Sequence, residues 1–451
     1  MGVSSMRAAV LIASPPEGWV TVRRTPTLIG SKRMLIESTP LPRLSTAQVA
    51  SRLKIKRETL YAYVARGLLV SEPSEDGGST FDPLDVEAFA ASRHRRAAPD
   101  EGRATLGKPL MVLESDLASI QDDELYFRGR PATDIARRLP FEDAARFLWA
   151  GSAPHDDLDD RFVSRPDVVS AVRRAAASLG PATRTIDQLP LAVAICGSWD
   201  PVRDATGPAA VRDAGRHMIA TMVDSLPALG APAAPDASLA ERLWPALSPS
   251  PATSQHLRLL DATMVLCMEH DLALSTMAAR VSASARANPY SAVTAALSSF
   301  DSAMHGGASI PASIMIEETI RTGNAEHALA RQLSETGLIP GFGHVVYRHE
   351  DPRARFLLDA MRPAPGFAPA LRAADRLIAV VSARSPRPLN LDLALASLIV
   401  GAEMRRDAGE LVFAVSRTAG WIAHIIDEYS RPALRLRPQS RYTGPRIPSR
   451  R

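Results

Sequence analysis

The most distinctive segment of the chain reads Pro340-Gly341-Phe342-Gly343-His344-Val345-Val346-Tyr347-Arg348 and continues, after two residues, as Asp351-Pro352-Arg353-Ala354. Glycine gives a turn conformational freedom, and its missing side chain lets a ligand come close to the backbone. We therefore expect His344 in a tight, accessible turn. A Gly-X-Gly-His turn is a weak signal by itself, but the whole run down to Ala354 is specific.

Two other acid–base residues lie in segments of the same kind. His305 stands in Met304-His305-Gly306-Gly307-Ala308, before an expected helix start whose positive end disfavours a charged imidazole. Asp392 ends Asn390-Leu391-Asp392, and a poorly hydrated pocket would raise its pKa and make it a better base. A helix N-cap is the competing interpretation of Asp392. Together, two imidazoles and a carboxylate suit removal of a proton beside a carbonyl group.

Composition is typical of a globular protein with two or three domains, since 46% of the 451 residues are hydrophobic and 23% are charged. No run approaches the roughly 18 apolar residues of a membrane span, so we expect no membrane partner. Met1 to Met34 lacks a signal-peptide pattern, and we expect a cytoplasmic protein. Cys196 and Cys267 lie in apolar helical patterns and are predicted to be buried, reduced thiols. No spacing of ligand residues indicates a metal site.

The N-terminal part shows a compact pattern of short elements after an irregular extension, residues 1–40. Ser45 and Gln48 form a capping box at the start of one helix. A second helix runs from about Lys56 to Arg66 and stops at Gly67. A small hairpin and a third helix complete a predicted domain over residues 41–98, and residues 99–107 read as a polar linker.

This order of elements resembles the winged helix-turn-helix domains of MerR-type and excisionase-type proteins. The resemblance implies that the second helix enters the major groove of DNA. Lys54, Lys56, Arg57 and Arg66 would then contact phosphates. The basic excess is slight and the net charge is only +4, so weak DNA binding through residues 41–98 and a protein-interaction module both stay open. We expect residues 1–100 to be dispensable for the chemistry.

Four further segments complete a recognisable set. They are Glu269-His270-Asp271-Leu272-Ala273-Leu274-Ser275-Thr276, Pro388-Leu389-Asn390-Leu391-Asp392, Ala414-Val415-Ser416-Arg417 and Arg437-Pro438-Gln439-Ser440-Arg441-Tyr442-Thr443-Gly444. With them, the chain from about Leu110 to Gly444 resembles the citrate synthase family. The resemblance implies an all-α fold of two domains, a large one over 108–306 and 403–451 and a small one over 307–402, preceded by the winged helix-turn-helix domain.

The resemblance also implies roles for individual residues. The catalytic set would be His305, which holds the thioester carbonyl, His344, which polarises the keto group, and Asp392, which takes the methyl proton. Substrate carboxylates would be bound by His270, Arg353, Arg417 and Arg437. Arg437 would reach into a partner's site, which requires a homodimer. Coenzyme A would contact Gly341, Gly343 and Arg348. Ala273 and Ser309 stand where many family members have Asn.

The predicted reaction is citrate synthase-type condensation of acetyl-CoA with oxaloacetate and water, giving citrate and CoA without a cofactor or metal. A 2-methylcitrate synthase that uses propionyl-CoA is an alternative within the same class. In a different class, the chain could be a DNA-binding regulator whose synthase-like body senses a ligand without turning it over. The complete set of His305, His344 and Asp392 favours an enzyme.

Overall fold

A computed structural model describes residues 41–74, 77–96, 112–150, 161–302, 306–385, 387–441 and 443–444, with the side chains of 94–96 excepted. The predicted extension 1–40, the linker 99–107 and His305 therefore lie outside the described residues. The described residues from Leu41 onward form one compact unit. The domain boundaries expected from the sequence stay predictions.

The N-terminal module, residues 41–96, combines helices with a small antiparallel sheet of strand order β1-β3-β2. Its capping box is confirmed, because the Ser45 side chain accepts from the Gln48 amide and the Gln48 side chain accepts from the Ser45 amide. The apolar residues of the module, among them Leu60 and Phe81, form a cluster of their own. The elements are β1 (Leu44–Ser45), α1 (Thr46–Leu53), α2 (Arg57–Ala65), β2 (Glu72–Pro73), β3 (Ser79–Phe81) and α3 (Pro83–Arg96).

The body is mostly helical, as the sequence predicted, but it also contains a second small sheet, which the all-α expectation did not include. The strands β4 (Ala118–Gln121), β5 (Glu124–Phe127) and β6 (Arg130–Pro131) pair in that order. Asp122 and Asp123 link β4 to β5, and both have positive φ, 51° and 61°. Such a two-residue turn matches the twist of the strands, but it usually carries Asn-Gly or Asp-Gly. The sequence signal for this hairpin was therefore weak.

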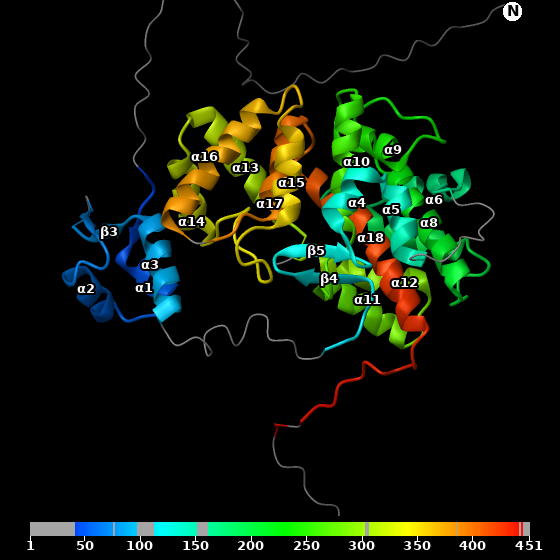
Figure 1. The fold of residues 1–451 in the computed structure, drawn as a ribbon, viewed down its shortest axis with the longest axis horizontal. Coiled ribbons are helices and arrows are strands. Elements are labelled where there is room, and N and C mark those ends of the chain that lie inside the picture. The colour runs from blue at the N-terminus through cyan, green and yellow to red at the C-terminus, as the bar shows by residue number, and fades with distance from the viewer. Residues whose placement is uncertain are drawn as a thin grey trace, which may run out of the picture. The chain divides into compact units, whose positions relative to one another are not determined.

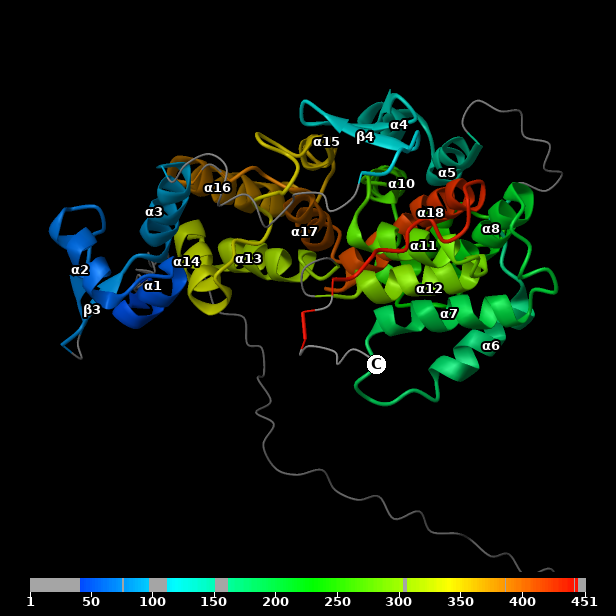
Figure 2. The same ribbon diagram turned by 90° about the horizontal axis from the view of Figure 1, so that it is seen from below.

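Helices make up most of the body, in two groups (Figures 1 and 2). The predicted large domain contains α4 (Ala132–Arg138), α5 (Phe141–Ala150), α6 (Pro166–Ala176), α7 (Gln188–Ser198), α8 (Pro208–Ser225), α9 (Leu239–Leu247), α10 (Ser254–Met268), α11 (Leu274–Ser284), α12 (Pro289–Phe300) and α18 (Ala408–Tyr429). The predicted small domain contains α13 (Ser309–Thr322), α14 (Ala325–Thr336), α15 (Pro352–Met361), α16 (Ala368–Arg384) and α17 (Leu391–Gly401).

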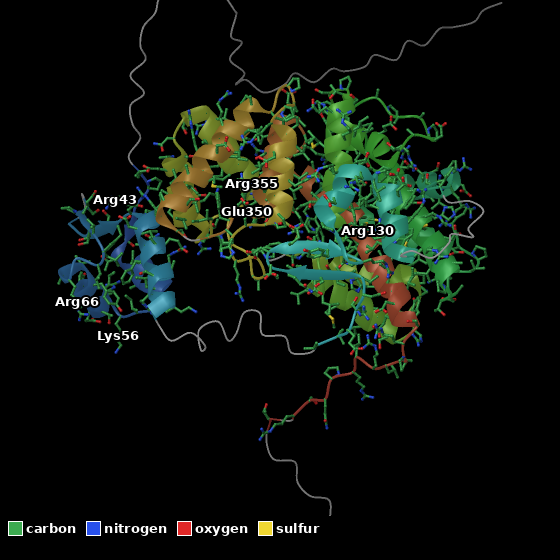
Figure 3. All side chains as sticks on the ribbon, viewed as in Figure 1. Arg43, Lys56, Arg66, Arg130, Glu350 and Arg355 are labelled. Atoms are coloured by element: carbon green, nitrogen blue, oxygen red, sulfur yellow. The ribbon has the colours of Figure 1, made fainter. Side chains whose placement is uncertain are left out.

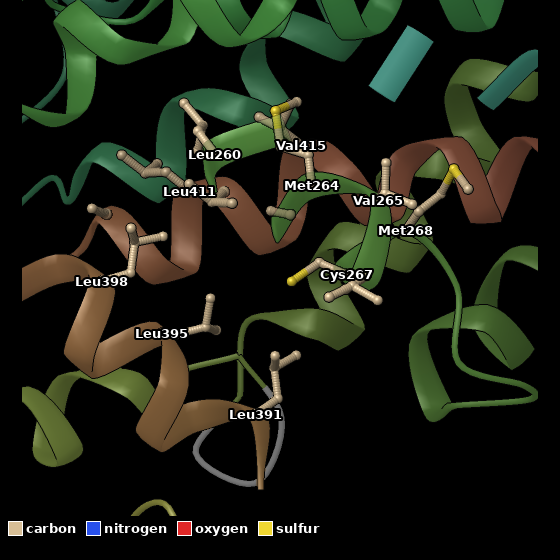
Figure 4. Packing of buried hydrophobic residues seen from close by; sticks show 14 of the residues in the cluster. Leu260, Met264, Val265, Cys267, Met268, Leu391, Leu395, Leu398, Leu411 and Val415 are labelled. Atoms are coloured by element: carbon tan, nitrogen blue, oxygen red, sulfur yellow. The ribbon is translucent and has the colours of Figure 1, made fainter. Parts of the chain in front are cut away.

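One continuous core joins the two groups of helices (Figure 4). Leu260 and Met264 on α10, Leu395 and Leu398 on α17 and Leu411 on α18 are all buried in it. Because α17 is apolar on nearly every side, it packs against neighbours all round. The helices α10 and α17 are thereby both packed against α18.

Gly420 shows how tightly α18 passes the end of α10. A Cβ atom added at this glycine would lie 2.2 Å from the carbonyl oxygen of Met268. Any larger residue would therefore push away the segment that carries Glu269 and His270. Among the described residues, no helix combines the length and apolar character that a membrane span requires.

Candidate active site

Three imidazole and phenol rings meet where the two groups of helices adjoin. His270 lies two residues after the end of α10, whereas His344 and Tyr347 belong to the loop before α15. The ring centroids of His270 and His344 are 5.2 Å apart, and that of Tyr347 is 4.6 Å from His344. The Tyr347 hydroxyl is hydrogen-bonded to Nε2 of His270 at 3.0 Å. The structure thus brings together two predicted site residues and adds Tyr347, which the sequence interpretation had not assigned.

The hydrogen bonds of His344 fix its tautomer. Its Nδ1 accepts from the backbone amides of Val346, at 3.0 Å, and Tyr347, at 3.3 Å. A neutral ring that accepts at Nδ1 carries its proton on Nε2. Burial, followed by the charge of Arg353, lowers the pKa of His344 to about 4. His344 is therefore neutral at pH 7 and presents Nε2–H as a hydrogen-bond donor.

Asp392 occupies the first turn of α17 and is not its N-cap, so the competing interpretation does not hold. Asn390 is the cap, and its side-chain oxygen accepts from the Asp392 amide at 3.0 Å. Burial raises the pKa of the Asp392 carboxyl to about 6, although Arg353 opposes this. The carboxylate is still mostly ionised at pH 7 and is a stronger base than an exposed Asp.

A short antiparallel contact holds the segments of His344 and Asp392 together. The Gly343 amide donates to the Pro388 carbonyl at 2.7 Å, and the Asn390 amide donates to the Gly341 carbonyl at 3.1 Å. The Asn390 side chain donates to the Gly343 carbonyl at 2.9 Å. Gly341 and Gly343 have φ angles of 85° and 93°, which residues other than glycine rarely adopt. The two predicted CoA-binding glycines therefore shape the turn that pairs with the Asp392 segment.

Arg417 is a buried cation on the other side of the site. Its Nε donates to the Cys267 carbonyl at 2.8 Å, and the residue is only 1% exposed. Within the part of the chain that the structure describes, its Nη2 has no hydrogen-bond partner. Burial lowers the pKa of Arg417 to about 10, and nearby Arg353 adds to this. A buried, incompletely paired guanidinium favours an anionic ligand.

Arg353 is engaged within the chain itself. Its Nε and Nη2 donate to the two carboxylate oxygens of Asp351, at 2.9 and 2.7 Å, and both residues are buried. The fork that was expected to grip a substrate carboxylate thus holds Asp351 here. Asp351 also accepts from the Leu391 amide at 3.1 Å, which links α15 to the start of α17.

A buried polar relay supports the segment of His270, and the sequence interpretation missed it. Arg280 on α11 donates to Nδ1 of His424 on α18 at 2.9 Å. Because arginine is only a donor, His424 carries its proton on Nε2 and donates to Glu269 at 3.1 Å. Glu269 is fully buried next to His270. No local motif could have indicated this contact between three distant helices.

The remaining predicted residues are not part of the gathered set. Arg348 and Arg437 are exposed. The hairpin tip holds the backbone next to Arg348, because Asp123 accepts from the amides of Arg348, at 2.6 Å, and His349, at 3.0 Å. Cys196 and Cys267 are free and buried, as predicted. Among the described residues, no group of side chains is arranged to hold a metal ion.

Comparison with known proteins places the chain in a family. Residues 107–439 match the family model of the citrate synthase C-terminal domain. A 2-methylcitrate synthase of Mycobacterium tuberculosis is 30% identical, with 80% of this chain and 96% of the relative covered. Citrate synthase 2 of Bacillus subtilis is 27% identical over 74% of this chain and 94% of the relative.

Solved structures agree. Citrate synthase from Thermotoga maritima superimposes with a TM-score of 0.60 and 26% identity, covering 75% of this chain and 95% of that chain. A Thermoplasma acidophilum citrate synthase, solved in a ternary complex with carboxymethyl coenzyme A and oxaloacetate, has the same fold. Its TM-score is 0.58 and its identity 20%, with 75% of this chain and 96% of that chain covered. The fold and family match define a transferase that performs a Claisen-type condensation. The chain belongs to the citrate synthase family.

Proposed function

We propose that the protein condenses acetyl-CoA with oxaloacetate and hydrolyses the product to citrate and CoA. One observation carries the proposal: a carboxylate of raised pKa, Asp392, and a neutral donor, Nε2–H of His344, are held together by paired backbone segments. These are the groups that proton removal and alkoxide protonation require. A mere sensor of either ligand has no need of such a base.

The reaction divides into three steps. Asp392 removes a methyl proton from acetyl-CoA, and the electron pair of that C–H bond forms an enolate, which His305 stabilises by a hydrogen bond. The enolate carbon attacks the keto carbon of oxaloacetate, and the keto oxygen takes the proton of His344. Water then cleaves the thioester bond of citryl-CoA. We propose that no metal or resident cofactor takes part. The leaving group is a thiol, and the reaction neither consumes nor produces an oxidant or a reductant.

The acceptor is proposed to lie between Arg417, Arg353 and His270. Nη2 of Arg417 is the best placed to bind a carboxylate, because it is buried and no described group accepts a hydrogen bond from it. Burial and the adjacent Arg353 lower the pKa of His270 well below its ordinary value, so this ring is neutral and binds as a hydrogen-bond partner. Asp351 offsets much of the charge of Arg353, which leaves Arg417 as the main cation for the negative charges of oxaloacetate.

The acyl donor has a second candidate, propionyl-CoA, which would give 2-methylcitrate. It is favoured by the 30% identity to a 2-methylcitrate synthase. Thiol release should be measured with oxaloacetate and either acetyl-CoA or propionyl-CoA at matched concentrations. A kcat/KM at least tenfold higher for acetyl-CoA supports the proposal, and the reverse ratio favours 2-methylcitrate. Release of thiol from neither would remove the enzymatic proposal.

We further propose a homodimer. The helix α11 leaves Leu274 and Val281, two turns apart on one face, 74% and 49% exposed. Apolar side chains at this spacing favour a helix-on-helix contact with a second subunit. The exposed Arg437 would then reach the partner's site. Sedimentation that shows a fully active monomer would refute this proposal.

For the N-terminal module we propose a winged helix-turn-helix assignment with weak DNA binding. The order of α1, α2, the β2–β3 hairpin and α3 supports it. Lys54, Lys56, Arg57 and Arg66 are exposed around α2 (Figure 3 labels Lys56 and Arg66). If DNA is the partner, its affinity must fall steeply as the salt concentration rises. Binding releases cations condensed on the DNA, and their release is less favourable in concentrated salt. Salt-independent binding would indicate a protein partner. A cytoplasmic location is part of the same proposal.

A further inference from the structure

We propose that Glu87, in the N-terminal module, is a positioning residue for the active site: its carboxylate joins the starts of the two segments that carry His344 and Asp392. The inference rests on the proposed function for its effect on turnover. Its structural basis is a set of contacts between the module and the small-domain helices.

The module is docked on these helices through α3. This helix contacts α14 and α16. Leu84 on α3 is 3% exposed and belongs to the main core of the body rather than to the module's own cluster. Arg384, the last residue of α16, donates to the Asp82 carboxylate at 3.2 Å. A buried leucine and an ion pair therefore fix α3 against the body.

Glu87 lies on α3 one turn after Leu84, and its side chain is only 7% exposed. One carboxylate oxygen accepts from Arg52 of the module at 2.7 Å, and the other accepts from Arg387 of the body. Burial by itself would raise the pKa of Glu87, but the two arginines together lower it. The carboxylate is therefore ionised, and each of its oxygens is bound by one arginine. These two charge-assisted hydrogen bonds hold Arg52 and Arg387 in fixed positions.

The two arginines lead to the two catalytic segments. Arg52 also donates to the carbonyl oxygen of Gly337, the residue that ends α14 just before the Gly-Phe-Gly-His turn. Arg387 opens the segment that ends at Asp392. Its guanidinium lies 3.5 Å from the point where a side chain on Gly343 would begin. Glu87 thus bridges the starts of both segments, whose middles pair through Gly343 and Asn390.

This bridge has a consequence for catalysis. The distance between His344 and Asp392 depends on the register of their two segments. The hydrogen bonds of Glu87 to Arg52 and Arg387 limit how far one segment can shift relative to the other. A misplacement of about 1 Å at reacting groups can cost on the order of 100-fold in rate. The expectation that residues 1–100 are dispensable makes the opposite prediction.

The test compares Glu87→Gln, which keeps shape but removes the charge, with the wild-type full chain. The matched control is Glu72→Gln, because Glu72 is an exposed carboxylate of the same module, paired with Arg43. We expect Glu87→Gln to lower kcat about tenfold with an unchanged KM for oxaloacetate, because the two arginines that Glu87 binds are not among the residues proposed to hold the acceptor. Glu87→Asp should recover part of the loss, and Glu72→Gln should leave kcat unchanged.

Hydrogen exchange gives a readout that does not depend on turnover. The amides of Gly343 and Asn390 should exchange faster in Glu87→Gln than in wild type or Glu72→Gln, because their bonds open more often. If wild type releases no thiol from either acyl-CoA, the proposed function fails and exchange alone decides this inference. If wild type is active, and Glu87→Gln keeps its kcat and its exchange rates, the inference is overturned. A lower melting temperature with unchanged kcat and exchange also overturns it, since the role would then be structural only.

Discussion

The two sides of the active site differ in how completely their polar groups are paired. On the small-domain side, Asn390 and Asp351 satisfy the backbone of the Gly341–Gly343 turn and of α17. On the large-domain side, Arg417 Nη2 and one oxygen of Glu269 are buried without a hydrogen-bond partner among the described residues. Unpaired buried groups cost free energy, whereas paired ones fix a geometry. The first side therefore has a fixed geometry in the free protein, whereas the second keeps Arg417 available for the anionic substrate of the proposed function.

The largest expected effect is the loss of the base on the small-domain side. Asp392→Asn keeps the shape of the side chain but removes the base, so kcat should fall by about 10²–10⁴-fold. The control is Asp359→Asn, an exposed carboxylate of α15 paired with Arg362, which should leave kcat unchanged. Near-normal turnover of Asp392→Asn in the thiol-release assay would exclude this base.

The same variant also tests the raised pKa. A carboxyl whose pKa is higher in the folded than in the unfolded state stabilises the fold only below its unfolded value, and this contribution is lost as pH rises through about 6. At pH 7.5, Asp392→Asn should therefore raise the melting temperature. At pH 3.5 the difference should vanish. An equal melting temperature at pH 7.5 would contradict the raised pKa of the Asp392 carboxyl.

The next effect concerns the large-domain side. Arg417→Met removes a buried cation whose pairing is incomplete without substrate, so affinity for oxaloacetate should fall about 10²-fold. The melting temperature of the ligand-free protein should not fall comparably, because the cation is poorly compensated there. Calorimetric titration and thermal unfolding measure the two quantities. Arg362→Met, an exposed arginine paired with Asp375, is the control. Unchanged oxaloacetate affinity would place the acceptor elsewhere.

A smaller effect tests whether the paired segments act through geometry. Asn390→Ala removes an N-cap and the bond to Gly343, and should cost about 1–2 kcal/mol of stability. Asn324→Ala removes the N-cap of α14 and should destabilise by a similar amount. Only Asn390→Ala should also lower kcat, by about tenfold. Equal kcat for both variants would show that the pairing is structural alone.

The smallest effect is on pH dependence. Because the Asp392 carboxylate must be ionised to accept a proton, kcat/KM should fall tenfold per pH unit below about 6. His344, with its pKa lowered to about 4, stays neutral over this range. A profile measured from pH 3.5 to 8 at constant ionic strength distinguishes the two groups. An acidic limb near pH 4 would assign the ionisation to His344 instead.

The small-domain side was largely predictable from sequence, because its features are local. Gly341, Gly343 and His344 share one turn, and Asn390 and Asp392 lie in another, so their motifs carried most of the geometry. Asp351 was in view within the Asp-Pro-Arg motif, but its grip on Arg353 was not anticipated. Nothing in the spacing tells whether an arginine fork faces a ligand or a carboxylate two residues away.

The large-domain side was less predictable, because its contacts are long-range. His424 lies in a long apolar helix where a histidine has no local signature. Its partners, Arg280 and Glu269, come from α11 and the end of α10. Likewise, the Asp122-Asp123 turn lacks the Gly that usually marks a hairpin. Residues of this kind acquire their roles only when distant helices pack.

The hairpin tip has a bearing on the timing of the reaction cycle. Asp123 receives two backbone amides and the ring nitrogen of His349, so the large-domain hairpin grips the small-domain loop through three contacts. If the two domains must move apart to release CoA, the three hydrogen bonds of Asp123 have to break first. Under the proposed function, a shorter or amide side chain at Asp123 would therefore change how readily the site opens, without touching any reacting group.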